Sequence, residues 1–174
     1  LSSLKEPRFS YLTVGYRLPQ PTMDVASRVL AGTQYESTIP NAVREHGEEP
    51  KLIKVETPAR LLGSITALVR SELDESDSGT LAVITPEQYV KPLSESFKAS
   101  SIEHGLVDDG ALTSQVTIVP VDLVKGLEID IAIVVEPSEI LNSATNGERS
   151  LYVALTRATR RLIIIHAEDL PSVL

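Results

Sequence analysis

Three short apolar runs in the second half of the sequence constrain its fold more than any other feature. They occupy residues 116–119, 131–135 and 162–165, and they are rich in Val and Ile. Strands that are buried on both faces of a parallel sheet have this nearly continuous apolar character, whereas a strand with one solvated face alternates apolar and polar residues. The runs therefore predict a parallel β-sheet that is covered by helices on both faces.

Three further strands are expected earlier in the chain, at residues 10–14, 51–55 and 80–84. Apolar residues at helical spacing follow each of them, and proline stands near each expected helix start, as is typical of a first helical turn. These prolines are Pro19 and Pro21, Pro58, and Pro86. Strands that alternate with helices imply right-handed crossovers between parallel strands. We expect one α/β domain over residues 1–174.

The connections between these elements are polar. Residues 33–50 are expected to form a long surface connection, and residues 105–110 a loop. The acidic run at residues 72–77 is interpreted as the solvated end of the helix that begins near Pro58, because charge runs usually face water. A last helix is expected over residues 147–158, before the final strand.

Composition excludes several kinds of protein and site. The chain has no cysteine, so it has no disulfide and no cysteine-based zinc site, and we predict no metal site from its three scattered histidines. No apolar run reaches the roughly 20 residues that span a bilayer. The net charge of −8 argues against a free-standing nucleic-acid binder. We expect a cytoplasmic protein and, because the sequence begins at Leu1 rather than Met, a piece of a longer one.

Polar residues at the predicted strand ends form a candidate site. Two arginines, a lysine and an aromatic ring are expected at one edge of the sheet, together with a flexible glycine and a carboxylate. The six residues are Tyr16, Arg17, Lys125, Gly126, Glu128 and Arg157. Arginine offers a planar fork that matches phosphate oxygens, and tyrosine offers a face on which a base can stack. Such a site could receive a polyanion that carries a flat base.

Simpler explanations exist for the same residues. Arg157, with Arg160 and Arg161, stands near the end of the expected last helix, where cations interact favourably with the helix dipole. Tyr16 could be a core residue, and Lys125 could simply be solvated. From the residues alone, the prediction is an α/β domain in which an anion site is one of two open interpretations.

Three stretches resemble the late motifs of superfamily 1 helicases of the UvrD/Rep type. Val124-Lys-Gly-Leu-Glu-Ile-Asp130 resembles the core of motif V, and Leu151-Tyr-Val-Ala-Leu-Thr-Arg-Ala158 closely matches motif VI. Leu12-Thr-Val-Gly-Tyr-Arg17 resembles motif IV. The motif VI match is highly specific, motif V nearly so, and motif IV alone would be weak. The three occur in the family's order and extend over nearly the whole chain.

The resemblance implies a RecA-like fold of the P-loop NTPase type and the second motor domain of a helicase. This domain closes over ATP and Mg²⁺ that are held mainly by an N-terminal motor domain of the same parent chain. By position, Arg157 would be the motif VI arginine finger and Arg17 the motif IV arginine, both at the γ-phosphate. Tyr16 would stack near the adenine, and Glu128, with Gly126 and Lys125 beside it, would contact the ribose and phosphates.

Departures from the family pattern qualify this expectation. The sequence has no Gly-x-x-x-x-Gly-Lys-Ser/Thr loop, so the domain alone is expected not to hydrolyse ATP. Pro120 and Asp122 stand where the family usually has the Thr and His that meet single-stranded DNA, which makes DNA contact by this domain weak. Residues 17–125 leave no room for the large UvrD/Rep insertion. Together with the Glu128-Ile-Asp130 form of motif V and the following Val134-Val-Glu-Pro137, this resembles the HelD branch, whose members act on RNA polymerase. A non-catalytic protein-interaction module stays open as the other interpretation.

Overall fold

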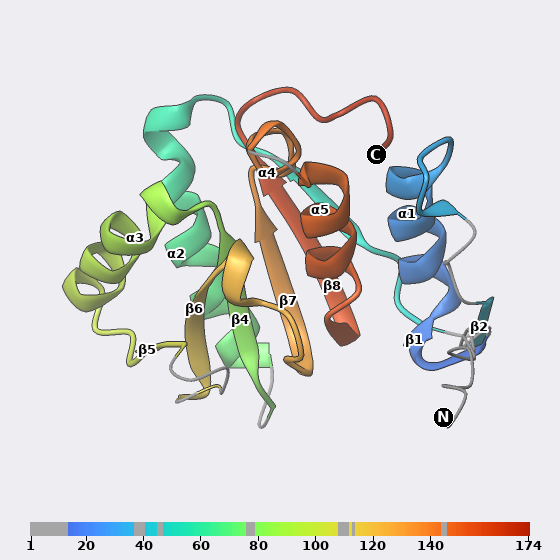
Figure 1. Ribbon diagram of the computed structural model, residues 1–174. Coiled ribbons are helices and arrows are strands. Elements are labelled where there is room, and N and C mark those ends of the chain that lie inside the picture. Colours follow the sequence, from blue (N-terminus) through green and yellow to red (C-terminus); the bar gives the residue numbers. More distant parts are fainter. Residues whose placement is uncertain are drawn as a thin grey trace, which may run out of the picture.

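The computed structural model is built around a six-stranded sheet in which every strand is parallel to its neighbours (Figure 1). It describes residues 14–36, 41–44, 47–75, 79–107, 112, 114–143 and 146–174. Across the sheet the strands are β3 (Lys51–Lys54), β8 (Ala158–His166), β7 (Ile129–Val135), β4 (Leu81–Thr85), β6 (Val116–Pro120) and β5 (Gly105–Leu106). The predicted parallel sheet is confirmed.

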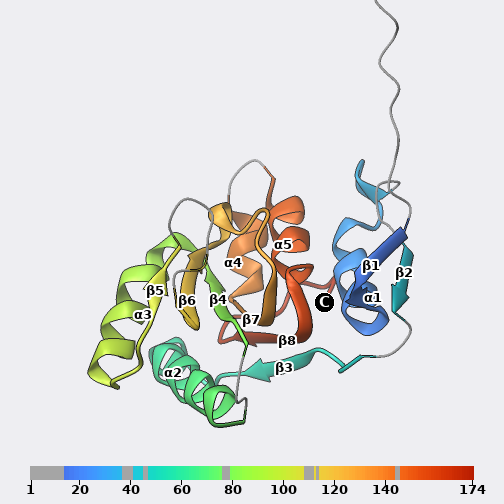
Figure 2. The same ribbon diagram turned by 90° about the horizontal axis from the view of Figure 1, so that it is seen from below.

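Helices cover both faces of this sheet (Figures 1 and 2). One layer consists of α2 (Pro58–Glu75) and α3 (Glu87–Ala99); the other consists of α1 (Gln20–Leu30), α4 (Pro137–Asn142) and α5 (Gly147–Leu155). Within β4, Val83 packs toward the first layer and Ile84 toward the second, and both side chains are fully buried. Because successive strand residues point to opposite faces, a strand between two layers must be apolar throughout. The sequence pattern was therefore a direct signature of the sandwich.

The amino-terminal region differs from the prediction. The first described strand is β1 (Val14–Pro19), so Tyr16 and Arg17 lie within a strand and not at its exit; residues 10–13 of the predicted strand lie outside the described residues. β1 pairs in parallel with β2 (Asn41–Arg44) in a separate two-stranded sheet. The predicted surface connection at residues 33–50 is therefore wrong in part. A four-residue strand without an apolar run leaves little periodic signal in a sequence.

The last helix ends earlier than predicted, at Leu155. Both the amide and the hydroxyl of Thr156 donate to the carbonyl oxygen of Tyr152, at 3.0 and 2.9 Å, and Ala158 already belongs to β8. A hydroxyl that bonds back to the preceding turn competes with helix continuation. Arg157 thus lies in the tight junction between α5 and β8. The short helix α4 and the two-residue strand β5 were not predicted either.

Glu72 was interpreted as part of a solvated helix end, and this is wrong. Its side chain is only 3% exposed, and its Oε2 accepts a hydrogen bond from Nη1 of Arg161 at 2.6 Å. Arg161 also contacts Glu48, at 2.5 Å, and Glu75, at 3.3 Å. Hydrogen bonds to Glu48 and Glu72 raise the pKa of Arg161 above its ordinary value. We call Arg161 and its three carboxylates the carboxylate clamp; it ties β8 to α2 and to the segment before β3.

The register of β8 changes between Arg157 and the carboxylate clamp. Ile129 of β7 pairs with Ala158, and Ile131 pairs with Arg161, so two steps on β7 correspond to three on β8. This register shift changes the direction of the side chains that follow it on β8, as a β-bulge does. It separates two arginines that are only four residues apart.

In the described part of the chain, no helix is both long and apolar enough to cross a membrane.

Candidate functional site

The turn between β6 and β7 presents two exposed residues between two buried anchors. After the short 3-10 helix η2 (Val121–Leu123), Val124 and Leu127 are 1% and 4% exposed, whereas Lys125 and Gly126 face solvent. Gly126 has φ +88°, and a Cβ built on it would meet nothing within 4 Å. The glycine is therefore required for its backbone conformation and not for space, since side chains disfavour this φ region. The buried side chains of Val124 and Leu127 fix the turn, so that Lys125 between them is exposed to solvent.

Backbone carbonyls hold the guanidinium of Arg157. Its Nε donates to the carbonyl oxygen of Val153 at 3.1 Å, and its Nη1 donates to that of Leu127 at 3.3 Å. The first contact caps the last turn of α5, as the helix-dipole interpretation requires, and the second joins Arg157 to the β6–β7 turn. Burial raises the pKa of the adjacent Tyr152 phenol, and the charge of Arg157 partly opposes this shift. The arginine is thus fixed in direction by two segments.

The turn and helix α5 enclose a groove of about 580 Å³. Its lining residues are Val121, Asp122, Val124, Lys125, Gly126, Asn146, Arg149, Ser150, Val153 and Arg157. Three of these carry a positive charge and only Asp122 carries a negative one, in a chain whose net charge is −8. Cations gathered in a concave surface focus the electrostatic potential and attract anions. We call this surface the cationic groove.

Three of the six predicted site residues meet in the cationic groove. Lys125, Gly126 and Arg157 line it together, although more than thirty positions separate the turn from the arginine. Glu128 is exposed and is not one of its lining residues. Tyr16 and Arg17 lie on β1, in the second sheet, and their side chains are outside what the structure describes. The predicted gathering of all six at one edge is therefore seen for half of them.

Arg149 is a groove residue to which the sequence reasoning gave no role. It is exposed and lies in the first turn of α5. Arg149, Val153 and Arg157 follow one another at intervals of four residues, and all three line the groove. Residues four apart on a helix share a face. This spacing was the signal that could have joined Arg149 to the site.

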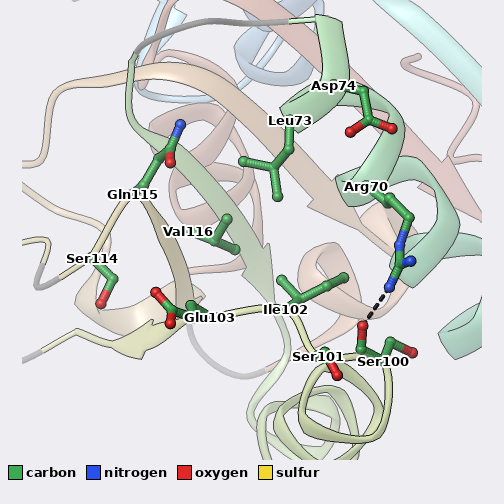
Figure 3. Close-up of a pocket in the computed structure, with 10 residues that line it drawn as sticks. All are labelled: Arg70, Leu73, Asp74, Ser100, Ser101, Ile102, Glu103, Ser114, Gln115 and Val116. Carbon is green, nitrogen blue, oxygen red and sulfur yellow. Dashed lines mark hydrogen bonds between the residues drawn. The ribbon is translucent and has the colours of Figure 1, made fainter.

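A second hollow, of about 640 Å³, lies between α2, the end of α3 and the start of β6 (Figure 3). Its one arginine, Arg70, points toward Ser100 and donates a hydrogen bond to that residue's carbonyl oxygen (Figure 3). Asp74 and Glu103 also line it, so carboxylates outnumber cations there. None of the predicted site residues lies in this hollow, and its charge does not suit a phosphate group. The cationic groove is the better candidate site.

Metal ligation receives no support from the described residues, among which no group of three His, Asp or Glu side chains is arranged to hold an ion.

Comparison with known proteins gives a family match. Residues 8–166 match the family model described as the viral superfamily 1 RNA helicase core domain. No sequence among curated proteins matches the chain.

Solved structures share the fold. The C-terminal domain of a possible DNA helicase from Lactobacillus plantarum WCFS1 aligns with a TM-score of 0.70 and 20% identity, over 91% of each chain. The arterivirus nonstructural protein 10 helicase, solved in complex with DNA, aligns with a TM-score of 0.50 and 10% identity, over 72% of this chain and 31% of that one. At such identities the likeness is one of fold, and that fold is the RecA-like architecture of helicase domains.

Proposed function

This chain belongs to the viral superfamily 1 RNA helicase core domain family, and we propose that it is the second motor domain of an ATP-driven helicase or translocase of the UvrD/Rep type. In this proposal an N-terminal motor domain of the same parent protein holds ATP and Mg²⁺. The present domain closes over the nucleotide and supplies the arginine finger, Arg157. Single-stranded DNA is the proposed track.

The observation that carries the proposal is the placement of Arg157. Its guanidinium is aimed by two backbone carbonyls, 3.1 and 3.3 Å away, and it lines a groove with a net excess of cations. The two carbonyl contacts fix the direction of the guanidinium, and carbonyl oxygens carry no net charge of their own. An arginine preorganised in this way can stabilise charge that develops on the transferred phosphoryl group. A purely structural arginine has no need of a concave cationic surface.

The other site residues would bind and orient the nucleotide. The exposed Lys125 provides a point charge for phosphate oxygens, and Gly126 lets the turn's backbone approach them closely. Tyr16 and Arg17 remain proposals for the base and the γ-phosphate, on the strength of the motif IV resemblance. Glu128 remains a proposal for the ribose. Opening and closing of the interdomain cleft would couple hydrolysis to movement.

A second candidate function is a motor of the HelD branch that acts on RNA polymerase. The residues that favour it are Pro120 and Asp122, at the carboxyl end of β6. Proline has no amide to offer a phosphate, and the exposed carboxylate of Asp122 repels one. A motor domain that binds nucleic acid weakly for this reason could instead act on a protein partner.

The test is the ATPase activity of the full-length parent protein, with Arg157→Ala beside the wild type. Each protein is measured alone, with single-stranded DNA and with RNA polymerase. We expect the substitution to lower turnover by about 10³-fold or more, the range known for arginine fingers, while ATP still binds. Whichever of single-stranded DNA and RNA polymerase raises the ATPase rate more is the partner on which the motor acts. Equal turnover in both proteins would leave the non-catalytic module as the better description.

A further inference from the structure

We infer that Thr80 and Asp130 are positioning residues for Arg157, because they fix the start of β7, next to the turn whose carbonyl oxygen orients the guanidinium. The inference rests on the proposed function, in which Arg157 is the arginine finger. Neither Thr80 nor Asp130 lines the cationic groove. Both therefore act through the backbone of the β6–β7 turn and not through contact with the nucleotide.

A closed set of hydrogen bonds joins Thr80 and Asp130 at the amino ends of β4 and β7. The amide and the hydroxyl of Thr80 both donate to Oδ2 of Asp130, at 2.8 and 3.1 Å. In return, the amide of Asp130 donates to the hydroxyl oxygen of Thr80 at 3.1 Å, and the amide of Ile131 donates to the carbonyl oxygen of Thr80 at 3.0 Å. Hydrogen bonds to a carboxylate are stronger than those between neutral groups. The first residues of β7 are thus fixed against β4.

The residues just before Asp130 are bonded to Arg157 and its neighbour. The amide of Ile129 donates to the carbonyl oxygen of Arg157 at 3.2 Å, and the carbonyl oxygen of Ile129 accepts from the hydroxyl of Thr159 at 3.2 Å. Two residues further back, the carbonyl oxygen of Leu127 accepts from Nη1 of Arg157 at 3.3 Å. This short stretch holds Arg157 by its main chain and by its guanidinium. A shift of the stretch therefore changes the direction of the guanidinium.

The apolar anchors of the turn do not set the direction of its carbonyl groups. Val124 and Leu127 bury their side chains, and Gly126 between them has φ +88°. Apolar burial is non-directional, and glycine has wide backbone freedom, so these residues hold the turn in place without fixing the orientation of each peptide plane. Hydrogen bonds are directional. Asp130 forms such bonds three residues after Leu127 and limits how far that carbonyl can turn.

Thr117 offers a matched comparison for a merely structural role. It lies near the amino end of β6, it is fully buried, and its hydroxyl donates to the carbonyl oxygen of Ser114 at 3.1 Å. In the sheet, β4 lies between β6 and β7, so Thr117 is two strands away from the start of β7. Thr117→Val makes the same chemical change as Thr80→Val at the same edge of the sheet.

The experiment measures single-turnover ATP hydrolysis by the full-length parent over a range of ATP concentrations, which separates the rate for bound ATP from the apparent ATP affinity. Thr80→Val and Asp130→Ala are expected to lower the rate for bound ATP about tenfold, because a misplaced catalytic group costs rate. The apparent ATP affinity should stay within about twofold of the wild type. Thr80→Ser and Asp130→Asn keep the hydroxyl and an acceptor oxygen, and should restore most of the rate. Thr117→Val should hydrolyse ATP at nearly the wild-type rate.

Double variants test whether Thr80 and Asp130 act through Arg157. Residues that act only by positioning Arg157 have no further effect on the hydrolysis rate once it is removed, so Thr80→Val combined with Arg157→Ala should hydrolyse ATP at the rate of Arg157→Ala alone. A further tenfold loss in the double variant would overturn the inference. Equal rates for Thr80→Val and Thr117→Val would overturn it as well.

Failure of the proposed function has a different readout, because there Arg157→Ala itself keeps the wild-type hydrolysis rate. Urea denaturation of each variant verifies that the domain is folded under the assay conditions. If Asp130→Ala does not fold, the comparison of Thr80→Val with Thr117→Val decides the inference by itself.

Discussion

Two arginines at the start of β8 are held in opposite ways. Arg157 is oriented by carbonyl oxygens and lines the cationic groove, whereas Arg161 is surrounded by three carboxylates and is only 18% exposed. The two are four residues apart, and a register shift lies between them. The two carbonyl contacts of Arg157 orient its guanidinium toward the groove that it lines. In the carboxylate clamp, the positive charge of Arg161 is paired with carboxylates of the protein itself.

Under the proposed function, this difference distinguishes the arginine that would act on a ligand from the one that stabilises the fold. Removal of Arg161 from the carboxylate clamp leaves the buried Glu72 with only the more distant Lys51, 3.9 Å away, and should destabilise the fold. Removal of a cation from the groove leaves no buried charge behind and should mainly change binding or turnover. Variants that compare the two sites can therefore contradict the assignment or make it more precise.

The largest expected effect on stability comes from Arg161→Ala. It leaves Glu72, whose side chain is 3% exposed, without its 2.6 Å partner, and we expect a loss of about 3 kcal/mol in the free energy of unfolding. Urea denaturation measures this. Arg60→Ala is the matched control, since it removes an exposed ion pair to Glu56 of 2.7 Å, a type worth about 0.5 kcal/mol. Equal losses in the two variants would show that the carboxylate clamp is not a buried pair.

A smaller effect is expected from charge removal at the acidic partners. Glu72→Gln keeps the volume of the side chain but loses a charged hydrogen bond, and should cost about 2 kcal/mol. Glu75→Gln makes the same change 3.3 Å from Arg161 at a side chain that is 55% exposed, and should cost less than about 0.5 kcal/mol. Chemical denaturation of both variants gives the ranking. The reverse ranking would contradict the assignment of Glu72 as the central carboxylate.

The smallest effect is a pH dependence from Glu48. Its hydrogen bond with Arg161 lowers the pKa of its carboxyl group below the ordinary value of 4.5. An acid whose pKa is depressed by folding contributes stability above its unfolded pKa, and this contribution is lost as the pH falls through the folded pKa. Below about pH 4.5, the unfolding free energy of Glu48→Gln should therefore fall less steeply than that of the wild type. Parallel curves for the two proteins would contradict this contact.

The parallel sheet could be predicted from the sequence because a strand that is buried on both faces has a continuous apolar run of its own. The Val and Ile runs of β6, β7 and β8 result from the positions of these strands between two layers, so each can be recognised in isolation. The strand β2 and the helix α4 are short and lack such a run. Their existence depends on partners elsewhere in the chain.

The site was predictable only where its residues belong to short motifs. Lys125, Gly126 and Arg157 were chosen from two local stretches, and the fold brings these stretches to one groove. The pairing of Arg161 with Glu72 spans 89 positions, so it cannot be predicted from the sequence around either residue. Arg149 was placed on the polar side of the last helix but received no role, because an exposed arginine on a helix is ordinary until the facing turn is known.

The most direct test of the account compares Arg157→Ala with Arg161→Ala in the full-length parent. Single-turnover hydrolysis of ATP and urea denaturation are measured on both proteins. We predict that Arg157→Ala lowers the hydrolysis rate about 10³-fold or more, with a loss of about 1 kcal/mol in the free energy of unfolding from its two carbonyl contacts, and that Arg161→Ala mainly lowers stability. An Arg157→Ala protein that hydrolyses bound ATP at the wild-type rate would contradict the assignment of Arg157 as the arginine finger.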